Sequence, residues 1–309
     1  MRKQSGTDHA LRVSIVGAGN LGTALALTLP GAGCEVKFIA TREKSGNQRH
    51  AKALARRVKA RLVELGQKPL ETDLVWIAVP DDCIAQVARQ LAATQDWKGR
   101  IVFHSSGALT SDELAPLREQ GARVASVHPM MTFVRGSVPN MAGVAFAVEG
   151  DAVATRAARG IVERLGGDAF PIRKQNKVLY HAFGSFASPL VIALMASLEQ
   201  VAQAAGVRKR DIKRVMLPLL LQTLRNYVYQ DAASAFSGPL ARGDVATVQK
   251  HLEQLKAVPE AREVYVVLAK AAVKNLPVKN RSALEQELNK LPHQEIVEGT
   301  RPPRKRIKA

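Results

Sequence analysis

The first residues whose spacing could do chemistry are the glycines of the sequence Gly17-Ala18-Gly19-Asn20-Leu21-Gly22. They follow a short apolar segment that predicts a strand, and they open a segment that predicts a helix. In this context Gly17 permits a tight turn, Gly19 lets a pyrophosphate approach the backbone, and Gly22 lets helix and strand pack closely. The N–H groups at the helix start would then bind the phosphates. We therefore predict a dinucleotide site at Gly17, Gly19, Asn20, Leu21 and Gly22; the alternative is a glycine-rich turn without a ligand.

The residues after the second predicted strand, 35–40, indicate which dinucleotide binds. A site for NAD usually places Asp or Glu about 20 residues beyond the glycines, where the carboxylate accepts a hydrogen bond from the ribose 2′-hydroxyl. This sequence has Thr41 and Arg42 there, followed by Glu43. A guanidinium suits a 2′-phosphate, and the Thr41 hydroxyl is a further donor. We therefore predict NADP(H), bound by Thr41 and Arg42; Glu43 is the one residue that argues for NAD.

Three further predicted strands end in polar or special residues, at the edge where open α/β sheets bind their ligands. One ends in Val79-Pro80, which we expect beside the cofactor ribose. His104 and Ser106 follow the next strand, and His128 follows the one after. Two histidines at neighbouring strand ends could line one substrate pocket, although backbone hydrogen bonds could equally satisfy both rings. We expect no metal site, because no third ligand has a suitable spacing.

A predicted helix that starts near residue 174 adds a second set of candidate residues. Lys177 and His181 are four residues apart, so they share a helix face. A lysine beside a nicotinamide can donate a proton to the group being reduced, and burial would lower its pKa toward neutrality. Further along, Arg242 lies in a glycine-containing loop and could bind an acidic substrate group. The alternatives are an exposed lysine with a packing histidine, and an Arg242 paired with Asp244.

The elements that must position these residues fall into two parts. Over 10–172, strand-like and helix-like segments alternate, which predicts a doubly wound parallel α/β sheet of the Rossmann type. Over 173–290 the apolar spacing is helical, which predicts an all-helical domain. Within these parts we expect one helix over 48–65 and one long helix over 174–205, bent at Pro189. The polar, proline-containing stretch 291–309 is expected to be a disordered basic tail.

Composition excludes several classes of protein. The chain has 309 residues, of which 46% are hydrophobic and 23% are charged, as in an ordinary globular protein. We expect no membrane span, because no apolar run reaches about 18 residues. Cys34 and Cys83 cannot form a disulfide framework, which favours the cytoplasm. The net charge of +18 favours anionic ligands, but only 5% of residues are aromatic and they are not interleaved with the basic runs. A nucleic-acid partner is therefore not favoured.

Together these motifs resemble the Rossmann-like proteins that carry a helical domain of unknown function 2520. The blocks that carry the resemblance are the glycine loop, His104-Ser105-Ser106-Gly107-Ala108-Leu109, His128-Pro129-Met130, Lys177 with Tyr180-His181-Ala182, and Gly238-Pro239-Leu240-Ala241-Arg242-Gly243-Asp244. The wider group is similar to 6-phosphogluconate dehydrogenase, β-hydroxyacid dehydrogenases and pyrroline-5-carboxylate reductase. The resemblance implies an NADP-linked oxidoreductase fold and a homodimer made through the helical domain.

Two positions depart from the pattern of these relatives. The β-hydroxyacid enzymes carry Lys and, four residues later, Asn; this chain has Lys177 and His181. The family tends to have Asn after a serine in the middle of the same helix, where this chain has Ser188-Pro189.

From the motifs and the resemblance together, we interpret the protein as a cytoplasmic NADP(H)-dependent oxidoreductase acting on a small, acidic carbonyl, alcohol or imine substrate. The alternatives are a non-catalytic NADP-binding sensor and a basic protein associated with nucleic acid.

Overall fold

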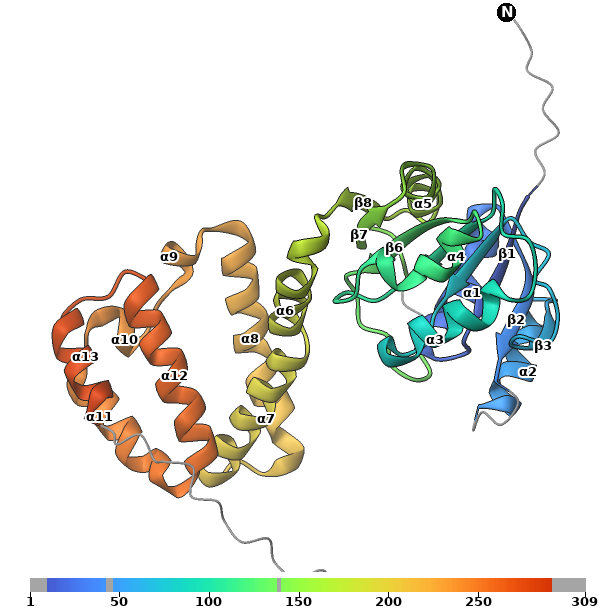
Figure 1. The fold of residues 1–309 in the computed structure, drawn as a ribbon. Coiled ribbons are helices and arrows are strands. Elements are labelled where there is room, and N and C mark those ends of the chain that lie inside the picture. Colours follow the sequence, from blue (N-terminus) through green and yellow to red (C-terminus); the bar gives the residue numbers. More distant parts are fainter. Residues whose placement is uncertain (1–9, 43–46, 138–139, 291–309) are drawn as a thin grey trace, which may run out of the picture. The chain divides into compact units, whose positions relative to one another are not determined.

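The buried apolar segments of the first part of the chain pair into one eight-stranded sheet (Figure 1). The computed structural model describes residues 10–42, 47–137 and 140–290. The strand order is β3-β2-β1-β4-β5-β6-β7-β8, which begins as a doubly wound sheet and confirms the predicted fold class. The strands are β1 (Leu11–Val16), β2 (Cys34–Thr41), β3 (Arg61–Glu64), β4 (Leu74–Ile77), β5 (Ile101–His104), β6 (Arg123–Pro129), β7 (Ala145–Gly150) and β8 (Asp168–Pro171).

Helices cover both faces of this sheet, because the central strands are apolar on both sides. One core contains residues of α1, α2 and α5, such as Leu25, Leu54 and Ile161. The other contains residues of α3 and α4, such as Ile84 and Leu117. The helices are α1 (Asn20–Thr28), α2 (Gln48–Arg57), α3 (Asp81–Ala92), α4 (Ala115–Glu119), α5 (Ala152–Arg164) and α6 (Lys177–Ala187), with short 3₁₀ turns at Leu29–Ala32, Ser111–Leu114 and Lys174–Asn176.

The structure differs from the sequence-based expectation at two places in the sheet. The helix expected over 48–65 ends at Arg57, where Lys59 adopts a positive φ of 56° and the chain turns back. The remainder forms β3, in which Val63 pairs with Ala40 of β2. In addition, β7 runs antiparallel to β6, so the sheet is not wholly parallel. A hydrophobic pattern predicts that a buried strand is present, but not whether it runs parallel or antiparallel to its neighbour.

The described residues divide into two compact units, of which the first ends at Ser188 and the second begins at Pro189, whereas the sequence indicated a boundary near residue 173. The later boundary places α6 with the sheet. Helical geometry is interrupted at Ser188, with φ −132° and ψ −83°, and α7 begins at Pro189. The long helix expected over 174–205 is therefore two helices, and Pro189 opens the second as a first-turn proline can. The predicted basic tail, 291–309, lies outside the described residues.

The second unit contains only helices among its described residues, 189–290. Its small core packs α11, α12 and α13 together around residues such as Val248, Val273 and Leu284. The helices are α7 (Pro189–Ala204), α8 (Ile212–Tyr229), α9 (Ala232–Ala235), α10 (Pro239–Arg242), α11 (Val245–Gln254), α12 (Pro259–Asn275) and α13 (Arg281–Asn289).

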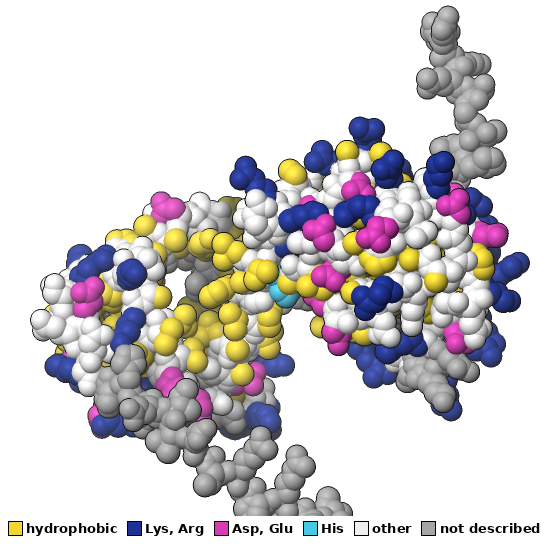
Figure 2. Space-filling model, in the orientation of Figure 1, with side chains coloured by type: hydrophobic (Ala, Val, Ile, Leu, Met, Phe, Trp, Pro, Cys, Tyr) yellow, Lys and Arg dark blue, Asp and Glu magenta, His cyan; other side chains and the backbone are white. Residues whose placement is uncertain are grey.

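Many apolar side chains are exposed on the helices that follow the sheet. Figure 2 shows hydrophobic side chains gathered over the helical part of the chain. The segment Lys174–Ala204 is long and apolar enough to cross a membrane by length and composition, and none of its most apolar window is buried. The expectation that no apolar run is long enough for a membrane span was wrong. The run between Lys177 and Glu199 is interrupted by serines and a glycine, but these residues add no charge, so the segment as a whole stays apolar. One such segment is a weak indication, since core helices of soluble proteins pass the same test.

Candidate active site

The glycine loop between β1 and α1 has a different packing constraint at each glycine. Gly17 has a φ of 106°, and a Cβ there would collide with the carbonyl oxygen of Ala78. A Cβ on Gly22 would collide with the carbonyl oxygen of Gly17. A Cβ on Gly19 would meet nothing within 4 Å, and Gly19 caps the N-terminus of α1. Gly17 and Gly22 thus hold the loop in place, while Gly19 leaves open space where helix N–H groups can bind a phosphate.

A cavity of about 250 Å³ extends from this loop along the carboxyl ends of the neighbouring strands. Among the predicted residues it is lined by Gly17, Gly19, Thr41, Arg42, Val79 and Pro80. No carboxylate occurs among its described lining residues, and Glu43 lies outside the described part of the chain. Uncharged and cationic donors at Thr41 and Arg42 fit a phosphorylated ribose better than a free 2′-hydroxyl.

Three of the predicted cofactor ligands do not line this cavity. The Asn20 amide donates to the carbonyl oxygen of Phe133 at 2.8 Å, and Leu21 packs against the sheet core. Gly22 supports the loop from behind, as its contact with Gly17 indicates. Cys83, Gln86 and Gln90 of α3 line the cavity instead; the sequence placed them in a helix but carried no signal that they face a ligand.

Lys177 lies at the start of α6 with no exposed surface. Its ammonium donates to the Ser126 hydroxyl at 2.6 Å and to the carbonyl oxygen of Ser106 at 3.0 Å. Burial lowers the pKa of Lys177 to about 8, while the charges of Glu149 and Asp81 oppose that shift. A lysine with this pKa can hold or release a proton near neutral pH.

The loop after β5 is built around Ser106 and His104. The Ser106 hydroxyl donates to the Asp81 carboxylate at 2.7 Å and accepts from the backbone N–H of Leu109 at 2.9 Å. His104 is fully buried; one ring nitrogen accepts from the Ser106 N–H at 3.1 Å, and the other bonds to the Thr110 carbonyl at 2.9 Å. Burial lowers the pKa of His104 to about 4, so its ring is neutral. His104 therefore supports the loop rather than facing a ligand.

His128 and His181 meet above the backbone of Gly107. Their ring centroids are 6.1 Å apart, and a Cβ on Gly107 would lie 2.8 Å from His128 Nε2 and 2.7 Å from His181 Cδ2. His181 is exposed, whereas His128 is half-buried and its Nδ1 lies 2.9 Å from the Tyr180 hydroxyl. Lys177, His181, Ser106 and His128 are thus brought together at one edge of the sheet.

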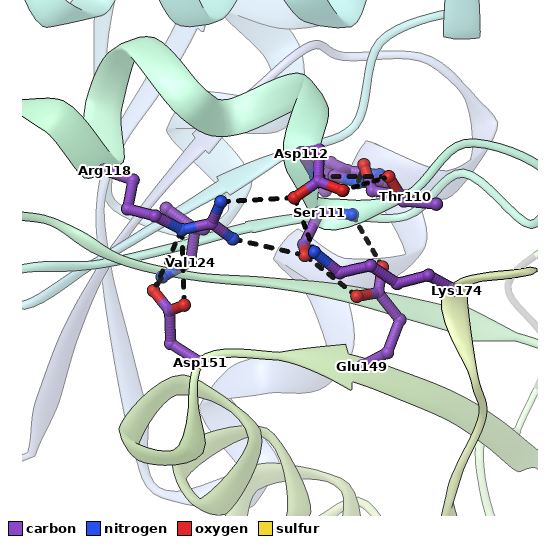
Figure 3. Close-up of polar contacts among 9 residues, drawn as sticks. Thr110, Ser111, Asp112, Arg118, Val124, Glu149, Asp151 and Lys174 are labelled. Carbon is purple, nitrogen blue, oxygen red and sulfur yellow. Dashed lines mark hydrogen bonds and ion pairs between the residues drawn. The ribbon is translucent and has the colours of Figure 1, made fainter.

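A network of charged residues fastens the start of α6 to this edge (Figure 3). Lys174 pairs with Asp112 at 2.5 Å, and Arg118 bridges Asp112 at 3.2 Å and Asp151 at 3.2 Å. Behind them the buried Glu149 of β7 accepts from the backbone N–H and hydroxyl of Ser111 at 2.6 and 2.8 Å. These contacts hold α6 where Lys177 reaches the strand ends.

Arg242 belongs to the second unit, where it is exposed at the end of α10. The following Asp244 caps α11 by accepting from the Thr247 N–H at 3.0 Å. This bond lowers the pKa of Asp244 most, and the charge of Arg242 lowers it further. No ion pair joins Arg242 and Asp244 among the described residues, so the guanidinium is not held by that carboxylate.

Sequence reasoning missed four residues of this site: Tyr180, Ser126, Glu149 and, as a partner of Ser106, Asp81. Two of them carried a signal: Tyr180 stands beside His181 in a helix predicted to face the site, and Asp81 directly follows Pro80 at a predicted strand end. Ser126 and Glu149 lie within strands. The alternation of side chains along a strand indicates which face of the sheet a residue points to, but not which residue it contacts there.

Family models match both parts of the chain. Residues 3–129 match the Rossmann-like domain, and residues 144–272 match the domain of unknown function DUF2520. The chain is a Rossmann-like protein with a C-terminal DUF2520 domain. The resemblance inferred from its motifs is thereby confirmed. A search of curated protein sequences gives no match to this DUF2520 protein.

Solved structures with the same fold cover nearly the whole chain. A Bacteroides fragilis protein described as an NADP oxidoreductase is 19% identical, with a TM-score of 0.69, covering 86% of this chain and 98% of its own. An imine reductase from Myxococcus stipitatus, in complex with NADP+, is 15% identical, with a TM-score of 0.62 and coverages of 90% and 99%. Plasmodium falciparum pyrroline carboxylate reductase, with NADP bound, is 14% identical, with a TM-score of 0.57 and coverages of 91% and 98%. At these identities the likeness establishes the fold of the DUF2520 protein.

Proposed function

We propose that this protein is an NADP(H)-dependent oxidoreductase that acts on a carbonyl, alcohol or imine carbon of a small, acidic metabolite. The observation that carries the proposal is the open backbone at Gly19, beside a cavity that ends at Thr41 and Arg42. Relatives of the same fold that bind NADP support it. When bound, the cofactor supplies the hydride, and the protein supplies binding, orientation and charge.

We propose that the residues gathered at the strand ends manage the proton that accompanies the hydride. Lys177 is fully buried, so it acts on the pocket through its charge and through its hydrogen bonds to Ser106 and Ser126. His181 is exposed and reaches a ligand directly, and His128 and Ser106 complete the wall. That Arg242, in the second unit, binds an acidic group of the substrate stays a prediction from the sequence.

The cofactor proposal is tested by calorimetric titration of the full chain with NADPH and NADH. We expect NADPH to bind more tightly. Arg42→Ala removes charge-assisted hydrogen bonds to the 2′-phosphate, so NADPH binding should weaken by about tenfold to a hundredfold while NADH binding stays the same. Arg57→Ala, at an exposed position at the far end of α2, is the matched control. Tighter binding of NADH, or no binding of either cofactor, would refute the proposal.

A second experiment distinguishes an enzyme from a non-catalytic NADP sensor. The absorbance of NADPH is followed while the protein is incubated with each member of a panel of keto acids and cyclic imines. Oxidation of NADPH by any of them supports an enzyme. Binding without turnover across the panel favours the non-catalytic NADP sensor. Location in the cytoplasm stays a prediction, as does the expectation that nucleic acid is not a partner.

We propose that a second copy of the chain covers the exposed apolar helix faces. On α6, Leu179 is 76% exposed and Phe183 is 62% exposed; on α8, Leu219 is 72% exposed and Tyr229 is 84% exposed. Apolar faces of this extent mark interfaces. Sedimentation of the purified chain at micromolar concentration should therefore give a dimer. A stable monomer would refute the proposal, and partition into lipid vesicles would instead favour a membrane-facing helix.

A further inference from the structure

The Tyr180 side chain is held in one position by two neighbouring rings. Its ring packs edge-on against His128, with centroids 5.5 Å apart, and against Phe170, with centroids 6.0 Å apart. Its hydroxyl lies 2.9 Å from His128 Nδ1. Tyr180 therefore contacts the one imidazole of the site that is neither fully buried nor fully exposed.

Both groups in this hydrogen bond are neutral near pH 7. Burial raises the pKa of Tyr180 to about 12, so the phenol keeps its proton. Burial and the nearby charge of Lys177 lower the pKa of His128 to about 4, so its ring is neutral, with one donor and one acceptor nitrogen. Among the described residues Nδ1 is the sole acceptor that the Tyr180 hydroxyl contacts. A hydroxyl that donates to Nδ1 leaves the ring hydrogen on Nε2.

The Nε2 side of His128 faces the space above Gly107. A Cβ at position 107 would lie 2.8 Å from Nε2, so a glycine is needed for the imidazole to approach the backbone this closely. Within the described part of the chain Nε2 has no hydrogen-bond partner, and it is not among the buried atoms that lack one. Lys177, in contrast, is fully buried and already donates to Ser106 and Ser126.

We propose that Tyr180 is a positioning residue that fixes His128 as its Nε2–H tautomer, and that this N–H is the hydrogen-bond donor to the reacting oxygen or nitrogen of the substrate. The donor role rests on the proposed function; the tautomer does not. A neutral imidazole donates to an atom as negative charge develops on it.

The tautomer is read directly from long-range proton–nitrogen NMR spectra of the histidine rings in the ligand-free full chain at pH 7. We expect His128, assigned by its loss in His128→Asn, to carry its hydrogen on Nε2. In Tyr180→Phe the Nδ1–H form should become detectable, because nothing then donates to Nδ1. The matched control is Tyr265→Phe: Tyr265 contacts His251 Nδ1 at 3.2 Å with the same edge-on geometry, so only His251 should change.

An Nδ1–H tautomer in the unmodified protein overturns the assignment, and so does a spectrum of His128 that Tyr180→Phe leaves unchanged. Once a substrate is found, His128→Asn should lower kcat by about a hundredfold or more while NADPH affinity stays the same; unchanged kcat overturns the donor role. If neither cofactor binds while His128 keeps the Nε2–H form, the proposed function and the donor role fail, but the positioning role of Tyr180 is supported.

Discussion

Lys177 gives the most direct physical test of the site, because its burial makes folding depend on pH. The folded protein lowers the pKa of Lys177 from 10.5 to about 8. Below about pH 8 both the folded and the unfolded chain carry the proton, and the folded chain bears the full cost of the buried charge, about 3 kcal/mol. Between pH 8 and 10.5 the unfolded chain holds a proton that the folded chain has lost. Raising the pH through this window therefore stabilises the folded state.

Lys177→Met removes this pH dependence while keeping a long apolar stem. The free energy of unfolding of the unmodified protein, relative to that of Lys177→Met, should rise by about 2.5 kcal/mol between pH 7 and pH 10. At pH 7 the variant should be as stable as the unmodified protein or more stable, since an apolar side chain replaces a buried charge.

Urea unfolding followed by tryptophan fluorescence measures the difference in unfolding free energy between the two proteins, and it does so for the structural unit that contains the sheet and Lys177. Both tryptophans of the chain, Trp76 and Trp97, are fully buried in the sheet unit, so their signal reports that unit alone. Lys52→Met, at an exposed position of α2, controls for the loss of a lysine as such. Parallel stability curves for the unmodified protein and Lys177→Met across this pH range would show that Lys177 is hydrated, and the reasoning about the site would be wrong.

Two further predictions concern the cofactor loop and the network behind the site. Gly19→Ala should fold normally yet weaken NADPH binding by about tenfold or more. Gly17→Ala should lower the urea midpoint, because a Cβ at Gly17 meets backbone and a Cβ at Gly19 meets nothing; equal midpoints would contradict this. Glu149→Gln should cost about 1–3 kcal/mol of unfolding free energy, because the amide cannot accept from both donors of Ser111. The same urea assay measures it, and an unchanged midpoint would refute the role of this contact.

The fold could be predicted from sequence wherever local chemistry determines the structure. The glycine loop, the strands on either side of it and the helical character beyond residue 173 follow from glycine spacing, apolar runs and helical periodicity. The errors occur where tertiary contacts decide. β3 forms from the end of a helix-like segment because it pairs with β2, and β7 runs antiparallel because of how it pairs with β6.

The candidate site could be predicted only as a set of neighbours. His104, Ser106 and His128 follow consecutive predicted strands. The topology of an open α/β sheet therefore predicts that all three lie at one edge of the sheet. Which of them faces a ligand depends on contacts that the sequence does not encode locally. Both ring nitrogens of His104 are hydrogen-bonded by its own loop, whereas Nε2 of His128 has no hydrogen-bond partner among the described residues.

Helical spacing has the same limit for Lys177 and His181. A separation of four residues places both on one face of α6, but Lys177 is fully buried and His181 is exposed. The difference arises because the Lys177 side chain reaches into the sheet edge, where Ser106 and Ser126 accept from its ammonium. The His181 ring, one turn later, lies beside His128 over Gly107. Under the proposed function, this difference in depth separates the roles: the buried lysine sets the local charge, and the more accessible imidazoles of His128 and His181 contact the ligand.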